Sequence, residues 1–241
     1  MPDIKQNITH VKAQIAATAA QCARETDSIT LLAVSKTQPA ERIRVAYAAG
    51  QRAFGENYVQ EAVEKQASLA DLAIQWHYIG PVQSNKTRII AESFDWVHSV
   101  DRLKIAQRLS EQRPKTLAPL NICLQINLDN EPSKSGMSLT ALPELAEQIL
   151  SLPQLYLRGL MAIPAPRGNE QEQQQVFEQL ATALANLHQA LPSTNLINRA
   201  PLDTLSMGMS NDMTAAIRAG STIVRVGTAI FGARQIMTEH P

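Results

Sequence analysis

The sequence predicts an α/β fold, a single (β/α)8 barrel of the TIM type with an extra N-terminal helix. The chain has 241 residues, the usual length of one such barrel, and 44% of them are apolar, enough for a large core. Runs of β-type residues alternate strictly with helical patterns, which indicates a parallel sheet. There are eight such runs, the number that closes into a barrel, and an open doubly wound sheet is the alternative.

The extra helix is predicted over residues 3–24. Its apolar side chains recur at the three- and four-residue spacing that places them on one helix face: Ile4, Ile8, Val11, Ile15, Ala19 and Cys22. No Gly/Ser-rich or Pro-rich linker divides the rest of the chain, whose longest irregular stretch is 192–203. We therefore expect one domain over residues 1–241.

The repeating part begins after this helix. Strands are expected at 29–36, 52–56, 74–80, 96–100, 121–128, 155–163, 204–207 and 223–231. Helices are expected between them at 39–50, 58–69, 84–94, 101–113, 142–152, 170–190 and 211–219. Pro39 and Gly50 are the start and stop signals of the first. Asp101 is the expected N-cap of the fourth, which has to end before Pro114.

Composition excludes several classes of protein. Lys plus Arg and Asp plus Glu number 22 each, so the chain lacks the positive field that attracts nucleic acid. No window approaches the roughly 18 consecutive apolar residues of a membrane span. Two cysteines cannot form a disulfide framework and no signal sequence opens the chain, so we expect a cytoplasmic protein. Metal-ligand spacings, phosphate-binding P-loops and serine-hydrolase elbows are missing from the sequence.

Lys36 ends the first predicted strand. Period-two alternation puts Leu32, Val34 and Lys36 on one face, so Lys36 points to the barrel mouth if the other two fill the interior. The reactive groups of such barrels lie at the carboxyl ends of strands. A lysine near apolar surface favours the free amine, which attacks aldehydes to form an imine. A solvated strand-end lysine is the alternative interpretation.

Two loops near the C-terminus are candidates for binding an anion. SMGMSN at 206–211 and VGTA at 226–229 follow the seventh and eighth strands, where barrels commonly bind phosphate. Both supply small residues, hydroxyls and accessible backbone N–H groups. Ser210 is expected to cap the helix that starts near Asn211. Two ordinary capped turns would give the same pattern.

Three further side chains are candidates for the pocket. Arg225 lies on the same strand face as Gly227 and is expected to point inward, where its partner is Asp101, Glu56 or an acceptor on a bound ligand. Asn57 follows the second strand and is either a ligand contact or a helix cap. His77, in the third strand, fits an interior histidine better than a catalyst.

Eight short strings, in this order and spacing, together resemble the pyridoxal-phosphate homeostasis protein family. They are AVSKT at 33–37, FGENY at 54–58, HYIG at 77–80, QSNK at 83–86, SKSGM at 133–137, RGLM at 158–161, SMGMS at 206–210 and VRVGTAIFG at 224–232. The resemblance covers residues 5–235. The segment 193–201 departs from it by being longer than we expect before the seventh strand.

The resemblance implies a barrel like the N-terminal domain of alanine racemase, which holds pyridoxal 5'-phosphate (PLP) as an internal aldimine on Lys36. It also implies that Ser210 and the backbone of Gly227 and Thr228 hold the phosphate, and that Arg225 faces the pyridine nitrogen. By the same resemblance, the further pocket residues are Asn57, His77 and Met207.

A function follows from the resemblance. An arginine beside the pyridine nitrogen disfavours protonation of the ring and weakens it as an electron sink. The chain ends soon after its last predicted strand, so we expect no second domain to supply the opposing acid or base of a racemase. The expected protein is a cytoplasmic monomer that takes part in vitamin B6 and amino-acid homeostasis and hands PLP to apo-enzymes. A weak PLP enzyme acting on amino acids and a cofactor-free Schiff-base aldolase are the alternatives.

Overall fold

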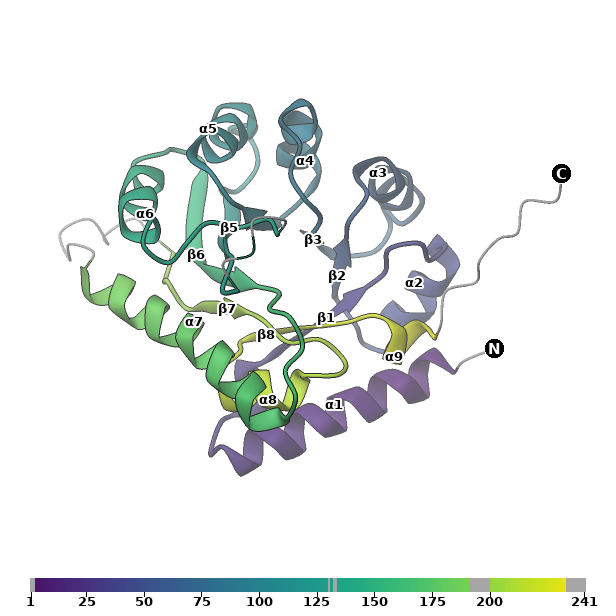
Figure 1. The fold of residues 1–241 in the computed structure, drawn as a ribbon. Helices are drawn as coiled ribbons and strands as arrows, with labels where there is room; N and C mark the ends of the chain where they lie inside the picture. Colours follow the sequence, from purple (N-terminus) through teal and green to yellow (C-terminus); the bar gives the residue numbers. More distant parts are fainter. Residues whose placement is uncertain (1–2, 130, 132–133, 191–199, 233–241) are drawn as a thin grey trace, which may run out of the picture.

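The barrel is closed in the structure, a computed structural model in which residues 3–129, 131, 134–190 and 200–232 are described. Eight parallel strands of the described chain follow one another in sequence order, and the first pairs with the last (Figure 1). The strands are β1 Thr30–Val34, β2 Ala53–Glu56, β3 Gln75–Tyr78, β4 Trp96–Val100, β5 Leu120–Ile126, β6 Leu155–Ala162, β7 Thr204–Ser206 and β8 Ile223–Val226. The predicted barrel is confirmed over the open sheet.

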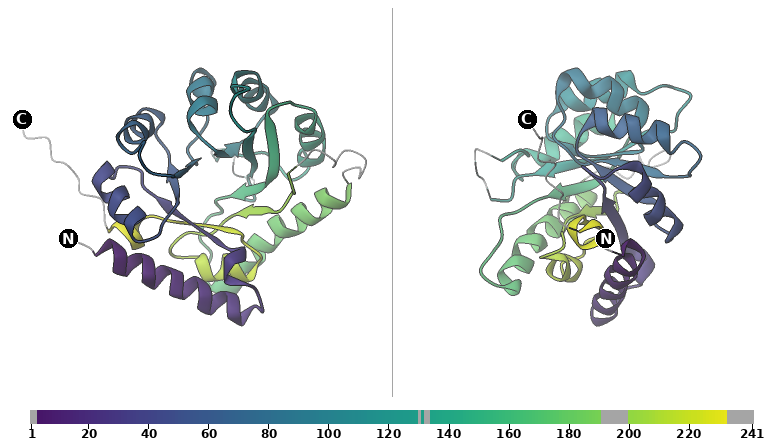
Figure 2. Two further views of the ribbon diagram at one scale, coloured as in Figure 1. Left: turned by 180° about the vertical axis from the view of Figure 1, so that it is seen from behind. Right: turned by 90° about the vertical axis from the view of Figure 1, so that its right-hand side faces the viewer.

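Helices surround this barrel. Apart from the N-terminal α1 Ile4–Gln21, the α-helices are α2 Ala40–Ala48, α3 Val59–Ser68, α4 Thr87–Ser93, α5 Leu103–Gln112, α6 Leu142–Leu150, α7 Glu170–Ala190, α8 Met213–Arg218 and α9 Thr228–Phe231. Two short 3-10 turns, η1 Thr26–Ser28 and η2 Ser84–Lys86, precede β1 and α4. Figure 2 shows these helices around the strands from two further sides. None of the described helices is long and apolar enough to span a membrane.

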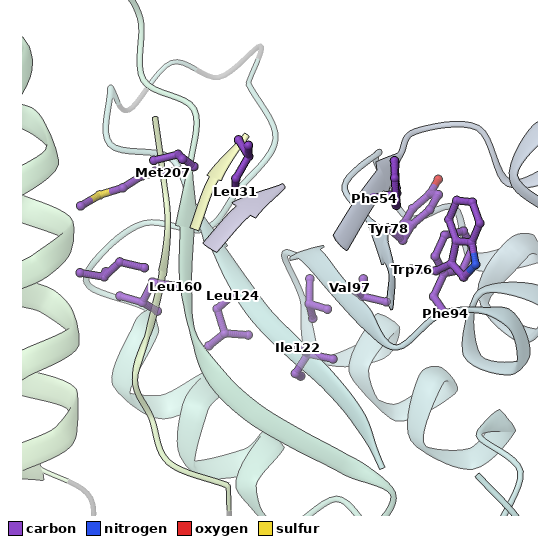
Figure 3. Packing of buried hydrophobic residues seen from close by; sticks show 14 of the residues in the cluster. Leu31, Phe54, Trp76, Tyr78, Phe94, Val97, Ile122, Leu124, Leu160 and Met207 are labelled. Atoms are coloured by element: carbon purple, nitrogen blue, oxygen red, sulfur yellow. The ribbon is translucent and has the colours of Figure 1, made fainter. Parts of the chain in front are cut away.

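The core has two layers because successive side chains of a strand point to opposite faces. On β1, Leu32 faces the barrel interior, where it belongs to a small cluster that includes Trp96 and Cys123. Its neighbour Leu31 points outward, into the larger cluster between strands and helices. Figure 3 shows part of this outer layer, including aromatic rings on β2, β3 and the segment before β4.

The extra helix α1 closes the outer layer beside the last strands. The Asp3 side chain caps it by accepting from the Gln6 amide at 3.0 Å. Its buried face packs against α8, α9 and α2, which Figure 1 shows along the purple helix. Asn7 Nδ2 also donates to the Ile230 carbonyl oxygen at 2.9 Å. This helix therefore joins the two ends of the repeating part.

Two predicted boundaries are wrong for local reasons. The last strand stops at Val226, because Gly227 (φ −112°, ψ −76°) turns the backbone and Thr228–Phe231 is the short helix α9. Asp101 does not cap α5. The N-cap is Arg102, whose guanidinium pairs with the Asp101 carboxylate at 2.6 Å. The predicted long segment 193–201 lies almost wholly outside the described residues.

Candidate cofactor site

A cavity of about 1010 Å³ lies at the carboxyl ends of the strands. It brings together six of the eight side chains and loop residues predicted for the pocket, from β8 and the segments after β1, β2, β7 and β8: Lys36, Asn57, Ser210, Arg225, Gly227 and Thr228. Because the carboxyl ends of all strands of a parallel barrel share one rim, residues far apart in sequence meet there.

Lys36 lies at this rim two residues beyond the end of β1. Leu32 belongs to the interior cluster, and Val34 and Lys36 line the cavity, so the predicted alternation along the first strand is confirmed. Lys36 is half-buried. It therefore lines a cavity whose wall also includes the apolar side chains of Val34 and Ile79.

The backbone on both sides of Lys36 is fixed by a buried ionic cluster. Lys65 Nζ donates to the Ser35 carbonyl oxygen at 2.8 Å and to Glu56 Oε1 at 2.8 Å, and Ser35 Oγ donates to the same Glu56 oxygen at 2.6 Å. On the other side, the Thr37 amide donates to Glu61 Oε1 at 2.6 Å, and Lys65 also donates to Glu61. Thr37 has a left-handed φ of 62°.

Burial makes the charges of this cluster depend on one another. The Glu56 side chain is fully buried, which raises the pKa of its carboxyl group, while the charge of Lys65 opposes the rise. A carboxylate without its ammonium partner would be strongly unfavourable there. The Glu56 and Lys65 pair thus depends on both members being present.

Arg225 points inward, as predicted, and lies at the edge of the cavity. Its guanidinium donates to the Ser206 carbonyl oxygen at 2.6 Å, to Ser206 Oγ at 2.8 Å and to the Ala162 carbonyl oxygen at 3.0 Å. Neither carboxylate considered from the sequence is its partner, because Glu56 pairs with Lys65 and Asp101 with Arg102. Burial lowers the pKa of Arg225 to about 10, which leaves it cationic at neutral pH.

The predicted anion-binding loops both reach the cavity, but the helix after the first loop does not have its predicted N-cap. Ser210 lines the cavity with an exposed side chain and does not cap a helix. The helix α8 starts later, after Asp212, whose Oδ1 accepts from the Met209 amide at 2.6 Å. On the other loop, Gly227 precedes α9, so the first backbone N–H groups of that helix need acceptors from outside it.

Two predicted pocket residues do not line the cavity. His77 is buried inside the barrel, where its ring stacks on Trp96 with centroids 5.4 Å apart, and burial lowers its pKa to about 3. This agrees with the interior role favoured for it from the sequence. Met207 is fully buried in the outer core, as Figure 3 shows.

Other residues of the cavity wall were not singled out as site residues from the sequence. They come from the loops after β5 and β6 and from α7, and include Lys134, Arg167 and Gln173. Asp129 joins the first two, accepting from Lys134 Nζ at 2.7 Å and from Arg167 Nη2 at 2.5 Å. The string around Lys134 was the one sequence signal for this side of the cavity, because the loop after β6 carries no motif.

Comparison with known proteins places the chain in a family. The family model for the N-terminal domain of alanine racemase matches residues 7–235. The pyridoxal phosphate homeostasis protein of Pseudomonas aeruginosa is 56% identical over 234 residues, which cover 97% of each chain. Its counterpart in Escherichia coli K12 is 54% identical over 237 residues, which cover 97% of this chain and 98% of that protein.

Comparison with solved structures leads to the same family and fold. PipY of Synechococcus elongatus PCC7942, with PLP bound, is 43% identical and superposes with a TM-score of 0.77, covering 90% of this chain and 100% of PipY. Alanine racemase from Corynebacterium glutamicum has a TM-score of 0.67 at 16% identity, with 95% of this chain and 62% of the racemase covered, which shows the shared fold alone. This chain therefore belongs to the pyridoxal phosphate homeostasis protein family, built on the fold of the alanine racemase N-terminal domain.

Proposed function

We propose that this chain binds PLP through the amine of Lys36 and carries it within the cell without catalytic turnover. The observation that carries the proposal is that one and the same cavity is lined by Lys36, Arg225 and the loops of Ser210 and Gly227. When bound, PLP supplies a reactive aldehyde on an electron-withdrawing ring. Every other role in the site belongs to residues of this chain.

The residues present fit such a ligand. Ser210 offers a hydroxyl and the start of α9 offers backbone N–H groups, which suit a phosphate. Arg225 uses three hydrogen bonds on protein acceptors and has N–H groups left for a ring nitrogen. The Asn57 Oδ1 atom is buried and has no hydrogen-bond partner among the described residues, so it can accept a hydrogen bond from a phenolic hydroxyl.

Several observations support a carrier over a racemase. Histidine, tyrosine and cysteine, which commonly serve as general acids and bases, are missing from the described lining of the cavity. Its two carboxylates already have protein partners, because Glu170 pairs with Arg218 and Asp212 accepts from the Met209 amide. Lys134 lines the cavity, but its hydrogen bond to Asp129 raises its pKa and keeps it protonated. Arg225 is a permanent cation and disfavours proton transfer to the ring. We infer that the chain holds PLP and passes it to apo-enzymes.

The proposed setting is a cytoplasmic monomer. Both cysteines, Cys22 and Cys123, are free, which suits a reducing compartment. Exposed large apolar side chains in the described chain are few and come from separate segments: Val45, Tyr58, Leu117, Ile163 and Met209. A stable subunit interface would need a larger continuous apolar patch.

The test is the absorption spectrum of the purified chain with PLP, before and after borohydride reduction. We expect a bound-PLP band that reduction makes permanent and that Lys36→Ala abolishes. The matched control is Lys115→Ala, since this exposed lysine precedes β5 at the opposite end of the barrel. A chain that stays colourless with PLP, or a Lys36→Ala variant that behaves like the control, would contradict the proposal.

Carrier and enzyme are separated by two further assays. Apo-enzymes should regain activity faster from the loaded chain than from the same concentration of free PLP. Equal rates would contradict a transfer role. Steady racemisation, transamination or elimination of amino acids at about 1 per second or more would instead identify a PLP enzyme.

A further inference from the structure

A chain of hydrogen bonds crosses the barrel interior from Arg225 to the amino end of β3. Arg225 Nη1 lies 2.8 Å from Ser206 Oγ, and Ser206 Oγ lies 2.7 Å from His98 Nδ1. His98 Nε2 then lies 2.9 Å from His77 Nδ1, and His77 Nε2 lies 3.0 Å from Gln75 Oε1. The five residues come from β8, β7, β4 and β3.

The arginine sets the direction of this chain. A guanidinium donates hydrogen bonds and cannot accept them, so Ser206 Oγ accepts from Arg225. The Ser206 hydroxyl hydrogen then points to His98 Nδ1, because the opposite arrangement would leave a buried O–H without an acceptor. His98 consequently donates from Nε2 to His77, and His77 donates from Nε2 to Gln75.

Each histidine therefore has one defined state, neutral with its hydrogen on Nε2. A second hydrogen on either ring would place two donors face to face inside the barrel. Burial, the neighbouring His77 and the charge of Arg225 lower the pKa of His98 well below its usual value, in agreement with this state. The direction itself follows from the geometry and the chemistry of arginine.

The surroundings of these residues offer few alternative hydrogen-bond partners. Ser206 and His98 are fully buried, and His77 and Arg225 are almost so. The interior cluster beside them consists of apolar side chains and Cys123. Only Gln75, at the amino end of the barrel, is exposed. A broken hydrogen bond in the middle of the chain would leave a buried polar group unpaired.

We propose that Ser206, His98 and His77 are positioning residues for Arg225, fixing its guanidinium toward the cavity through a one-way hydrogen-bond chain. This inference rests on the proposed function, in which Arg225 meets the ring nitrogen of PLP. These hydrogen bonds would hold a charged donor, the Arg225 guanidinium, in a fixed position beside that ring nitrogen. Neither histidine can pass a proton toward the cavity, because each donates its single hydrogen away from Arg225.

The first test reads the histidines directly in the full chain without PLP. Long-range proton–nitrogen NMR spectra of the 15N-histidine-labelled protein identify which ring nitrogen carries hydrogen. We expect His77 and His98 to be neutral and protonated on Nε2 between about pH 6 and 8. The exposed His10 and His188 provide reference signals in the same spectrum. Hydrogen on Nδ1, or an imidazolium at either interior position, would overturn the proposal.

The second test removes the hydrogen bond between Arg225 and the Ser206 hydroxyl. Ser206→Ala removes the hydroxyl but keeps the carbonyl acceptors of Ser206 and Ala162, so Arg225 loses one of its three hydrogen bonds. We expect the band of bound PLP to shift and PLP affinity to fall about tenfold. The hydroxyl-preserving Ser206→Thr should restore both the band and the affinity.

Failure of this inference is distinguishable from failure of the proposed function. A Ser206→Ala variant that binds PLP with unchanged band and affinity would overturn the positioning role, because the wild-type chain would still bind PLP. A wild-type chain without a PLP band would count against the proposed function instead. The histidine states are read without PLP and do not depend on that result.

Discussion

Lys65 Nζ lies 2.8 Å from the main-chain carbonyl oxygen of Ser35, the residue before Lys36. The same ammonium contacts Glu56 and Glu61, and Glu61 binds the amide of the residue after Lys36. A buried lysine from α3 thus fixes the backbone on both sides of the proposed anchor. Its role is structural, because its hydrogen bonds are already made to protein acceptors.

Replacing Lys65 should therefore affect both stability and PLP binding. Lys65→Met leaves the Glu56 carboxylate buried without its partner, and loss of one member of such a pair costs about 3–5 kcal/mol. We expect that loss in the free energy of unfolding, measured by urea denaturation. PLP should also bind more weakly, because Ser35 and Thr37 lose their common support.

A double variant is the control for this prediction. Lys65→Met combined with Glu56→Gln removes the uncompensated charge, so part of the lost stability should return. If the single variant is as stable as the wild type, the ionic cluster does not support this part of the fold. Full PLP affinity in a folded Lys65→Met variant would show that PLP binding at Lys36 does not depend on Lys65.

Gly80 should tolerate no side chain, because it closely approaches the proposed PLP contact Asn57. A Cβ atom on Gly80 would lie 2.3 Å from the Asn57 carbonyl oxygen. We expect Gly80→Ala to destabilise the protein by about 1–3 kcal/mol and to weaken PLP binding by displacing Asn57. At the exposed Gly168, the nearest neighbour of such an atom is Glu172 Oε2 at 3.4 Å, so Gly168→Ala should be neutral. Thermal unfolding and PLP titration of both variants check the contrast.

The interior histidines predict a pH dependence of stability. Burial lowers the pKa of His77 from 6.5 to about 3, and burial is also the largest cause of the lowered pKa of His98. Between pH values of about 3 and 6.5, the unfolded chain therefore binds more protons than the folded chain. Stability should therefore rise with pH across this window, and fall as the pH drops below 6.5, by at most about 1.4 kcal/mol per pH unit for each histidine.

Urea denaturation at several pH values between about 5 and 7 measures this slope. His77→Gln removes one of the titrating groups, so its stability should depend less on pH over the same range. Met161→Leu, an apolar replacement in the same interior cluster, keeps both histidines and should keep the slope of the wild type. A wild-type stability that is flat over this range would contradict neutral, buried histidines.

The fold was largely predictable because each element carries its own signal. The helix pattern at 170–190 and the strand at 96–100 agree with α7 and β4 to the residue. The last strand was overextended because the apolar run after Gly227 suits a strand or a helix equally well. The cap of α8 was misassigned for a similar reason. Ser210 and Asp212 are both good capping residues, and the backbone decides between them.

The site was predictable where it follows from one strand and less so where several strands combine. The position of Lys36 follows from alternation along β1. The bonds from Arg225 to Ser206 and on to His98 join three strands across the interior, and no spacing along the chain encodes them. Likewise, nothing near Lys65 in the sequence indicates that its ammonium reaches the Ser35 carbonyl oxygen.

The proposed phosphate site predicts a specific effect of negative charge at Ser210. This side chain lines the cavity and is exposed, so an aspartate there should fold normally. Two unit charges of the same sign about 4 Å apart repel by about 1–4 kcal/mol near a protein surface, so Ser210→Asp should weaken PLP binding by about tenfold or more. Titration followed by absorbance measures the affinity. Pyridoxal, which lacks the phosphate, is the matched ligand and should bind the variant and the wild type equally. If Ser210→Asp weakened both ligands alike, the charge would be acting through the fold; if it weakened neither, the phosphate would lie away from this loop.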